Sequence, residues 1–268
     1  MNGPPPNERT AAPSGGHPTR WLVGLAWLAA TLTACATRAP VPSASGPAAA
    51  DPPAAWARVL RAHVLDDGRI DFVALRRDSR DLDAYVAWVA ANGPATTPPR
   101  FSTPAARLAY YINAYNALAM RHVVASERRP VQRYRFFLLS EFMVDGRPVS
   151  LYALENRVIR PLGDPRVHFA LNCMVRGCPR LPREPFDPLT LDVQLDRETR
   201  RFLDEPRNVQ VDPPLRVVHL NEIMRFYTAD FLAQAPSLLA FVNRYRTEPV
   251  PADYDVRFIP YDWTLHQR

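Results

Sequence analysis

The sequence predicts an α+β fold, in which one helix-rich domain with short antiparallel hairpins follows an export signal and a disordered tether. Three observations support this prediction. Several segments read as amphipathic helices with polar caps, and short apolar runs flank turn signals such as Asp145-Gly146. Helices and hairpins also alternate without a regular strand–helix–strand rhythm, which favours α+β over a doubly wound parallel sheet. The 268 residues, 47% of them hydrophobic, suffice for one sizeable domain.

Residues 1–34 have the features of a bacterial lipoprotein signal peptide. The apolar run Trp21–Leu32 follows the positive charge of Arg20 and is shorter than the roughly 20 residues that a membrane-spanning helix needs. It ends in Leu32-Thr33-Ala34-Cys35, which resembles the lipobox in which small residues precede an acylated cysteine. Cys35 is therefore predicted to be the lipidated N-terminus of the mature protein. The alternative is a plain secreted protein that is cleaved near Ala34.

A lipidated Cys35 would place the protein in the bacterial cell envelope, on the periplasmic side of a membrane in a Gram-negative cell. Residues 35–54 are rich in Ala, Pro and Ser, which is typical of a tether between the lipid and a folded domain. The globular domain is expected at 55–268. Its expected partners are the membrane, through Cys35, and an unknown envelope protein or small molecule.

The charge pattern argues against a nucleic-acid partner. All 33 basic residues are Arg, and they are scattered along the chain rather than clustered on one element. The sequence contains no Gly-rich phosphate loop, no HExxH, no GxSxG and no EF-hand pattern. We therefore expect no nucleic acid, no cofactor and no metal site.

The first half of the domain is predicted to be mainly helical. Asp81 opens one helix, and Thr103 followed by Pro104 begins a long one, since an oxygen cap and a proline at the first position favour a helix start. The expected elements are helices at Trp56–Leu65, Leu82–Ala91 and from Pro104 to about Ser126, and a short strand at Ile70–Val73.

The second half is predicted to mix hairpins and helices. Ser150, Asn221 and Ser237 are the expected helix caps. The expected strands are Phe142–Val144, Arg147–Val149, Arg166–Asn172, Asn208–Val211, Arg216–Leu220 and Asp255–Ile259, and the expected helices follow Ser150 as far as Pro161 and cover Leu195–Leu203, Glu222–Leu232 and Leu238–Tyr245.

Four motifs carry a family resemblance. They are Tyr111-Ile112-Asn113-Ala114-Tyr115-Asn116-Ala117-Leu118, Leu154-Glu155-Asn156 with Ile159-Arg160, His168-Phe169-Ala170-Leu171-Asn172-Cys173 with Gly177-Cys178-Pro179, and Tyr261-Asp262-Trp263-Thr264-Leu265. Together they resemble the uncharacterised domain of unknown function 547 family, over about Phe101 to Leu265. The resemblance implies membership but no particular reaction. The chain departs from the family pattern at His266, where Asn is usual, and at Gly177, where Ser is common.

Cys173 and Cys178 admit three interpretations. As the thiols that remain after Cys35 is lipidated, they could form a disulfide in an oxidising compartment. One could instead be a nucleophile, with Cys173 at the end of the strand and His168, or another histidine, as its base. Both could ligate a metal with His168, although this spacing is long for zinc and a fourth ligand is not evident. On a strand, His168 would face away from Val167 and Phe169.

Two amides lie on one face of the long helix. Asn113 and Asn116 are three residues apart, and amides are poor helix formers because they compete for backbone hydrogen bonds. They could form a buried polar network that fixes loop backbone, or they could orient a substrate or stabilise an oxyanion.

Further candidates for ligand contacts are Glu155, Asn156, Arg160 and Arg176. Glu155 and Arg160 are five residues apart, so an ion pair with another element is the main alternative to a role in a site. Arg176 would lie at the tip of the loop between the cysteines. The closing motif is expected to be a docking motif, with Trp263 in the core and Asp262 capping backbone.

Two functions therefore remain open. The protein is either a non-catalytic envelope lipoprotein that binds a partner or small ligand, or a Cys/His-dependent hydrolase or transferase. In the second case Cys173 is the nucleophile, His168 the base, and Asn113 or Asn116 a polarising donor.

Overall fold

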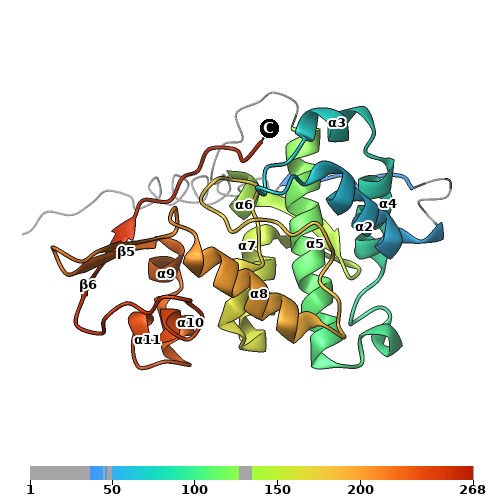
Figure 1. Ribbon diagram of the computed structural model, residues 1–268. Helices are drawn as coiled ribbons and strands as arrows, with labels where there is room; N and C mark the ends of the chain where they lie inside the picture. Colours follow the sequence, from blue (N-terminus) through green and yellow to red (C-terminus); the bar gives the residue numbers. More distant parts are fainter. Residues whose placement is uncertain (1–36, 45, 47–49, 127–134, 268) are drawn as a thin grey trace, which may run out of the picture. The chain divides into compact units, whose positions relative to one another are not determined.

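The computed structural model describes residues 37–44, 46, 50–126 and 135–267, and these belong to one compact unit (Figure 1). The predicted signal peptide and Cys35 lie outside the described residues. Within the described residues, no helix is long and apolar enough to cross a membrane.

Helices predominate, and the α+β prediction is confirmed. The α-helices are α2 (Pro52–His63), α3 (Phe72–Arg77), α4 (Arg80–Ala91), α5 (Pro104–Ala125), α6 (Arg135–Leu139), α7 (Leu151–Leu154), α8 (Leu191–Asp204), α9 (Ile223–Phe226), α10 (Thr228–Leu232) and α11 (Leu238–Val242). Short 3₁₀ segments cover Pro98–Phe101, Arg160–Leu162 and Pro165–Phe169, and a π-helical turn covers Glu155–Ile159.

The described strands form two small sheets. They are β1 (Thr37–Arg38), β2 (Ser140–Val144), β3 (Arg147–Ser150), β4 (Val209–Asp212), β5 (Val217–Asn221) and β6 (Asp255–Ile259), in the orders β1-β2-β3 and β4-β5-β6. The β2–β3 and β4–β5 pairs are the predicted antiparallel hairpins. Asp145 and Gly146 both have positive φ at the β2–β3 turn, as a tight hairpin requires. The parallel contacts β1–β2 and β5–β6 join segments that are distant in sequence, so no local signal marked them.

Helix α5 is the central element of the larger hydrophobic core. Thr103 caps it as predicted, accepting from the Ala106 N–H at 3.1 Å. Its side chains are buried along most of its length, and Ile112, Leu118 and Met120 are fully buried. Figure 1 shows α5 in the middle of the domain, with α2 and α4 beside it.

A second, phenylalanine-rich core lies under β4–β6 and α9–α11. It contains Phe169, Phe231 and Phe241. Val167, two residues before Phe169, belongs to the larger core around α5. The segment that leads into the cysteines is therefore anchored in both cores.

Two predicted strands are wrong. At Ile70–Val73 only Ile70 makes bridges, whereas Phe72 begins α3 because Asp71 caps that helix by accepting from the Ala74 N–H at 2.9 Å. Arg166–Asn172 is not a strand either. Asp164 accepts from the Arg166 N–H at 3.0 Å, and Pro165 at the first position starts a 3₁₀ turn instead. The predicted two-faced arrangement fails with it, since Val167, His168 and Phe169 are all buried.

The predicted helices are confirmed at their expected places, but their first and last residues differ from the predicted ones. Ser150 accepts from the Ala153 N–H at 3.1 Å, and Ser237 accepts from the Ala240 N–H at 3.0 Å. After α7 the helix widens into the π-helical turn, a feature common at functional sites. The helix predicted after Asn221 is interrupted at Tyr227, which separates α9 from α10.

Candidate functional site

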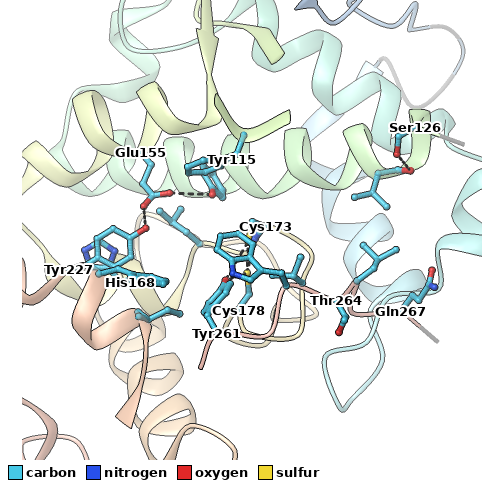
Figure 2. A pocket seen from close by; sticks show the side chains of 18 of the residues that line it. Tyr115, Ser126, Glu155, His168, Cys173, Cys178, Tyr227, Tyr261, Thr264 and Gln267 are labelled. Atoms are coloured by element: carbon cyan, nitrogen blue, oxygen red, sulfur yellow. Dashed lines mark hydrogen bonds between the residues drawn. The ribbon is translucent and has the colours of Figure 1, made fainter. Parts of the chain in front are cut away.

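A cavity of about 590 Å³ contains most of the chemically interesting side chains (Figure 2). Its walls come mainly from α5, the π-helical turn, α9, residues 170–179 (the cysteine loop) and residues 261–267 (the C-terminal segment), with single residues from α3, α6 and the 3₁₀ segment Pro165–Phe169. The lining residues are Arg76, Tyr115, Val123, Ser126, Phe137, Glu155, His168, Leu171, Cys173, Val175, Cys178, Ile223, Phe226, Tyr227, Tyr261, Trp263, Thr264, Leu265 and Gln267.

Both cysteines face this cavity as free thiols. Their sulfurs are 2.7 Å apart, which is longer than the roughly 2.05 Å of a disulfide bond. The Cys178 sulfur also lies 3.1 Å from the backbone N–H of Cys173 and 2.9 Å from the hydroxyl of Tyr261. The predicted disulfide is thus not formed in this structure, and it stays a prediction.

The contacts make the two thiols unequal. The pKa of Cys173 is raised well above its usual value by its contact with the Cys178 sulfur and by burial. Burial also acts to raise the pKa of Cys178, but donors from Cys173, Tyr261 and the backbone outweigh it and lower that pKa. Because the first proton therefore leaves Cys178, this residue rather than Cys173 is the better candidate for a thiolate.

Asn116 and Asn172 hold the cysteine loop in place. Asn116 donates to the Ala170 carbonyl at 3.0 Å and accepts from the Asn172 N–H at 2.8 Å. Asn172 in turn donates to the Pro179 carbonyl at 2.7 Å and accepts from the Met174 N–H at 2.6 Å. Two amides thereby connect α5 to both ends of the loop.

Asn113 has the same kind of role elsewhere. It donates to the Phe186 carbonyl at 2.8 Å and accepts from the Phe186 N–H at 3.0 Å and from the indole of Trp56 at 3.2 Å. Neither Asn113 nor Asn116 is among the lining residues. Of the two alternatives, the geometry therefore favours a buried polar network over a catalytic amide.

The C-terminal segment runs beside the cysteine loop. Arg176 and Gly177 donate backbone N–H groups to the carbonyls of Thr264 and Asp262, each at 2.8 Å. A Cβ at Gly177 would meet the Tyr261 ring at 2.8 Å, so glycine lets this ring lie flat against the loop. Trp263 is half-buried and lines the cavity rather than the core. Asp262 caps the Thr264 N–H at 2.9 Å, as expected.

Glu155 forms an acidic end of the cavity. Glu155 is only 3% exposed, and its carboxylate accepts from the hydroxyl of Tyr115 at 3.2 Å and from that of Tyr227, as Figure 2 shows. Burial raises the pKa of Glu155, and the two tyrosine hydrogen bonds partly oppose this rise.

His168 lies next to this acidic end. Its Nε2 is 2.8 Å from an oxygen of Asp230, and its ring stacks on Tyr227 with centroids 3.7 Å apart. Burial lowers the pKa of His168, and the hydrogen bond and charge of Asp230 partly oppose this effect. Among the described hydrogen bonds, none joins His168 to a cysteine.

The remaining predicted candidates lie around Asp230 and at the loop tip. Arg160 makes a two-pronged ion pair with Asp230 at 2.7 and 2.8 Å, and donates to Asn156 at 2.5 Å. This is the expected pairing of Arg160 with another element. Arg176 is exposed on the cysteine loop and is not among the lining residues.

The sequence analysis did not propose a chemical role for three tyrosines of the site. Tyr115 and Tyr261 lie inside the quoted motifs, so their positions in these motifs were the available signal. Tyr227 lies outside the motifs, at the break between α9 and α10, and only the folded chain brings it to Glu155. In the described residues, no cluster of three or more His, Cys, Asp or Glu side chains could hold a metal ion.

Comparison with known proteins gives a similarity to one family over part of the chain and no activity. Residues 99–203 match the family model described as "Protein of unknown function, DUF547". Over these residues the chain is similar to that family. The match contains Tyr115, Glu155, His168 and both cysteines, whereas Tyr227, Asp230 and Tyr261 follow it in the sequence. Searches of curated proteins and of solved structures gave no match.

Proposed function

We propose that this protein is an exported, lipid-anchored domain that binds a small, largely apolar molecule in the cavity at the cell envelope. The leader and Cys35 motivate the location, by their sequence pattern alone. The cavity motivates the binding function and is the observation that carries it. Its volume of about 590 Å³ lies within the range of about 300–1,000 Å³ that is typical of small-molecule sites.

The lining of the cavity also fits a ligand site. Most of it is apolar or aromatic, including Phe137, Ile223 and Leu265, and a few polar groups converge on it. Residues from all four sequence motifs form its walls. Ligand pockets combine an apolar wall with a few placed polar groups in this way.

A cavity-filling variant tests the proposal. Leu265→Trp would put a larger side chain into the cavity from a half-buried position, so ligand binding should be lost with little loss of stability. The measurement is the shift in melting temperature of the soluble domain with a panel of small apolar compounds. Leu189→Trp is the matched control, because Leu189 is 94% exposed and away from the cavity. A panel that stabilises both variants equally would contradict the proposal.

The second candidate function is a thiol-dependent hydrolase or transferase. One specific observation favours it: the Cys178 sulfur faces the cavity and accepts from the Cys173 N–H and the Tyr261 hydroxyl, contacts that lower its pKa. In that reaction the Cys178 sulfur attacks an acyl carbon, a thioester forms, and the leaving group departs with the proton that Cys178 gave up. Water or a second substrate then takes the acyl group and regenerates the thiol.

Alkylation rates test the second candidate. Cys178 in Cys173→Ser should react with iodoacetamide at pH 7 about tenfold faster than Cys173 in Cys178→Ser, since a thiolate is the reactive form. Tyr261→Phe in the Cys173→Ser background should slow the reaction, because it removes the hydroxyl that stabilises the Cys178 sulfur. Equal rates for the two single variants would remove the basis for this candidate.

A further inference from the structure

Aromatic side chains line the same cavity as Glu155, and two of them, Tyr115 and Tyr227, contact its carboxylate. The aromatic lining residues are Tyr115, Phe137, Phe226, Tyr227, Tyr261 and Trp263. Among the described lining residues, Glu155 carries the one carboxylate. Aromatic faces attract cations through their negative π-face, and a buried carboxylate adds a full charge to this attraction.

Glu155 makes no direct ion pair in the described residues, although Arg160 acts on it at longer range and lowers its pKa. Arg160 is engaged with Asp230 in a two-pronged ion pair, and His168, whose pKa is lowered by burial, also contacts Asp230. In the described residues, no ion pair joins Glu155 to a basic side chain. Arg160, Asp230 and His168 thus nearly balance, and an ionised Glu155 gives this end a net negative charge.

The arginine that lines the cavity lies far from Glu155. Arg76 contacts the Val123 carbonyl at 3.5 Å, and Val123 follows Tyr115 by two turns of α5. At 1.5 Å per residue this corresponds to about 12 Å along the helix. Arg76 therefore does not neutralise Glu155 at short range.

The hydroxyl groups of Tyr115 and Tyr227 hold the Glu155 carboxylate in a fixed position. Tyr115 donates to one oxygen of Glu155 and Tyr227 to the other. Each hydroxyl favours the ionised form against burial, and each carboxylate oxygen keeps a lone pair for a further donor. The carboxylate is thus held in place with acceptor capacity to spare.

We infer that the Glu155 end of the cavity binds the cationic ammonium group of an otherwise apolar ligand. This inference rests on the proposed ligand-binding function and names the chemical class of its ligand. The ammonium group hydrogen-bonds to Glu155 and lies against the aromatic rings, while the alkyl part fills the apolar cavity.

Three probes of the same length test the inference: hexylammonium, 1-hexanol and hexanoate. They share the alkyl chain and differ in charge, so calorimetry at pH 7.5 compares only the head group. Hexylammonium should bind at least about tenfold more tightly than 1-hexanol, and hexanoate more weakly than both. Glu155→Gln should bring hexylammonium within about threefold of 1-hexanol and leave 1-hexanol binding unchanged. Glu141→Gln, a change of a partly exposed glutamate on β2 that is not among the lining residues, should keep the wild-type preference.

A second variant covers the case in which Glu155→Gln does not fold. Tyr227→Phe keeps the ring but removes one donor to Glu155, so the pKa of Glu155 rises further. The preference for hexylammonium should then appear only at higher pH than in the wild type.

The outcomes separate this inference from the proposed function. If 1-hexanol and hexylammonium bind the wild type equally, the cation inference is overturned while the cavity remains a ligand site. If an ammonium preference persists in Glu155→Gln, the charge is recognised elsewhere and the inference is also overturned. If none of the three probes binds, the proposed ligand-binding function fails and the inference fails with it.

Discussion

Cys173 and Cys178 differ in their hydrogen-bond donors although their sulfurs are in contact. Cys178 receives a backbone N–H and the Tyr261 hydroxyl, whereas Cys173 gains only a weaker contact with Tyr261, at 3.5 Å. The sequence interpretation placed the nucleophile at Cys173 with His168 as its base. The contacts instead give the thiolate to Cys178 and direct His168 towards Asp230.

The two thiols should be readily oxidised to a disulfide. With the sulfurs already 2.7 Å apart, mild oxidation should close a Cys173–Cys178 disulfide with little movement of the loop. Intact mass with and without reduction should differ by two hydrogen atoms per chain, and Cys173→Ser should remove this difference. The thiolate-stabilising donors on Cys178 should make the bond easy to reduce, since they favour the reduced form. Two free thiols after treatment with oxidised glutathione would contradict the prediction.

The helices around the site act mainly by fixing the backbone of neighbouring loops. Helix α5 contributes Tyr115 to the site, while its amides Asn113 and Asn116 fix loops behind it. The π-helical turn presents Glu155, and the break between α9 and α10 presents Tyr227 to the same carboxylate. The site therefore depends on irregular segments that are anchored by regular ones.

Asn116 should stabilise the fold by holding the cysteine loop. Asn116→Leu removes both side-chain hydrogen bonds to the cysteine loop and leaves the Ala170 carbonyl and the Asn172 N–H without their partner. The free energy of unfolding should fall by about 1–3 kcal/mol, the usual cost of such orphaned groups. Asn113→Leu should have a similar effect through Phe186.

Urea unfolding followed by circular dichroism measures this effect. Gln210→Leu is a suitable control, because Gln210 is an exposed residue of β4. If Asn116→Leu and Gln210→Leu change stability equally, the amide does not hold the loop.

Partly and fully buried histidines affect the stability of the whole molecule. Burial lowers the pKa of His63, His122, His168 and His266 below the usual value of 6.5. The unfolded chain therefore binds more protons than the folded one as the pH falls below about 6.5, and stability decreases in that range. Glu155 acts in the opposite sense above its ordinary pKa of 4.5, because its folded pKa is raised.

His122→Gln isolates the histidine contribution. Burial lowers the pKa of His122, so this variant should lose less stability than the wild type between pH 7.5 and 5.5. Urea unfolding at a series of pH values makes the comparison. A variant that follows the wild-type pH profile would show that His122 stays neutral or charged in both states.

Lipidation of Cys35 should attach the exported protein to the membrane. Cys35→Ala should leave the exported protein without acyl chains, because the lipobox cysteine is the predicted site of modification. Detergent phase partitioning and metabolic labelling with a fatty acid report the change. A Cys35→Ala variant that partitions like the wild type would contradict the prediction. Ser43→Ala in the predicted tether serves as a neutral control.

Local signals in the sequence determined most regular elements. Thr103-Pro104 began the long helix, Asp145-Gly146 formed the hairpin turn, and Ser150 and Ser237 capped helices, since each depends on residues a few positions apart. The same signals failed at Asp71 and Asp164, where a capping aspartate outweighed strand-like residues.

The tertiary structure alone decided what the motifs do together. Tyr227 and Asp230 come to Glu155 and His168 across more than sixty positions of the chain, and Tyr261 comes to Cys178 across an even longer separation. Sequence spacing specifies only contacts within a turn or a hairpin. The choice of thiolate, the partner of His168 and the acidic end of the cavity depend on burial and on distant donors, which exist only once the two cores have formed.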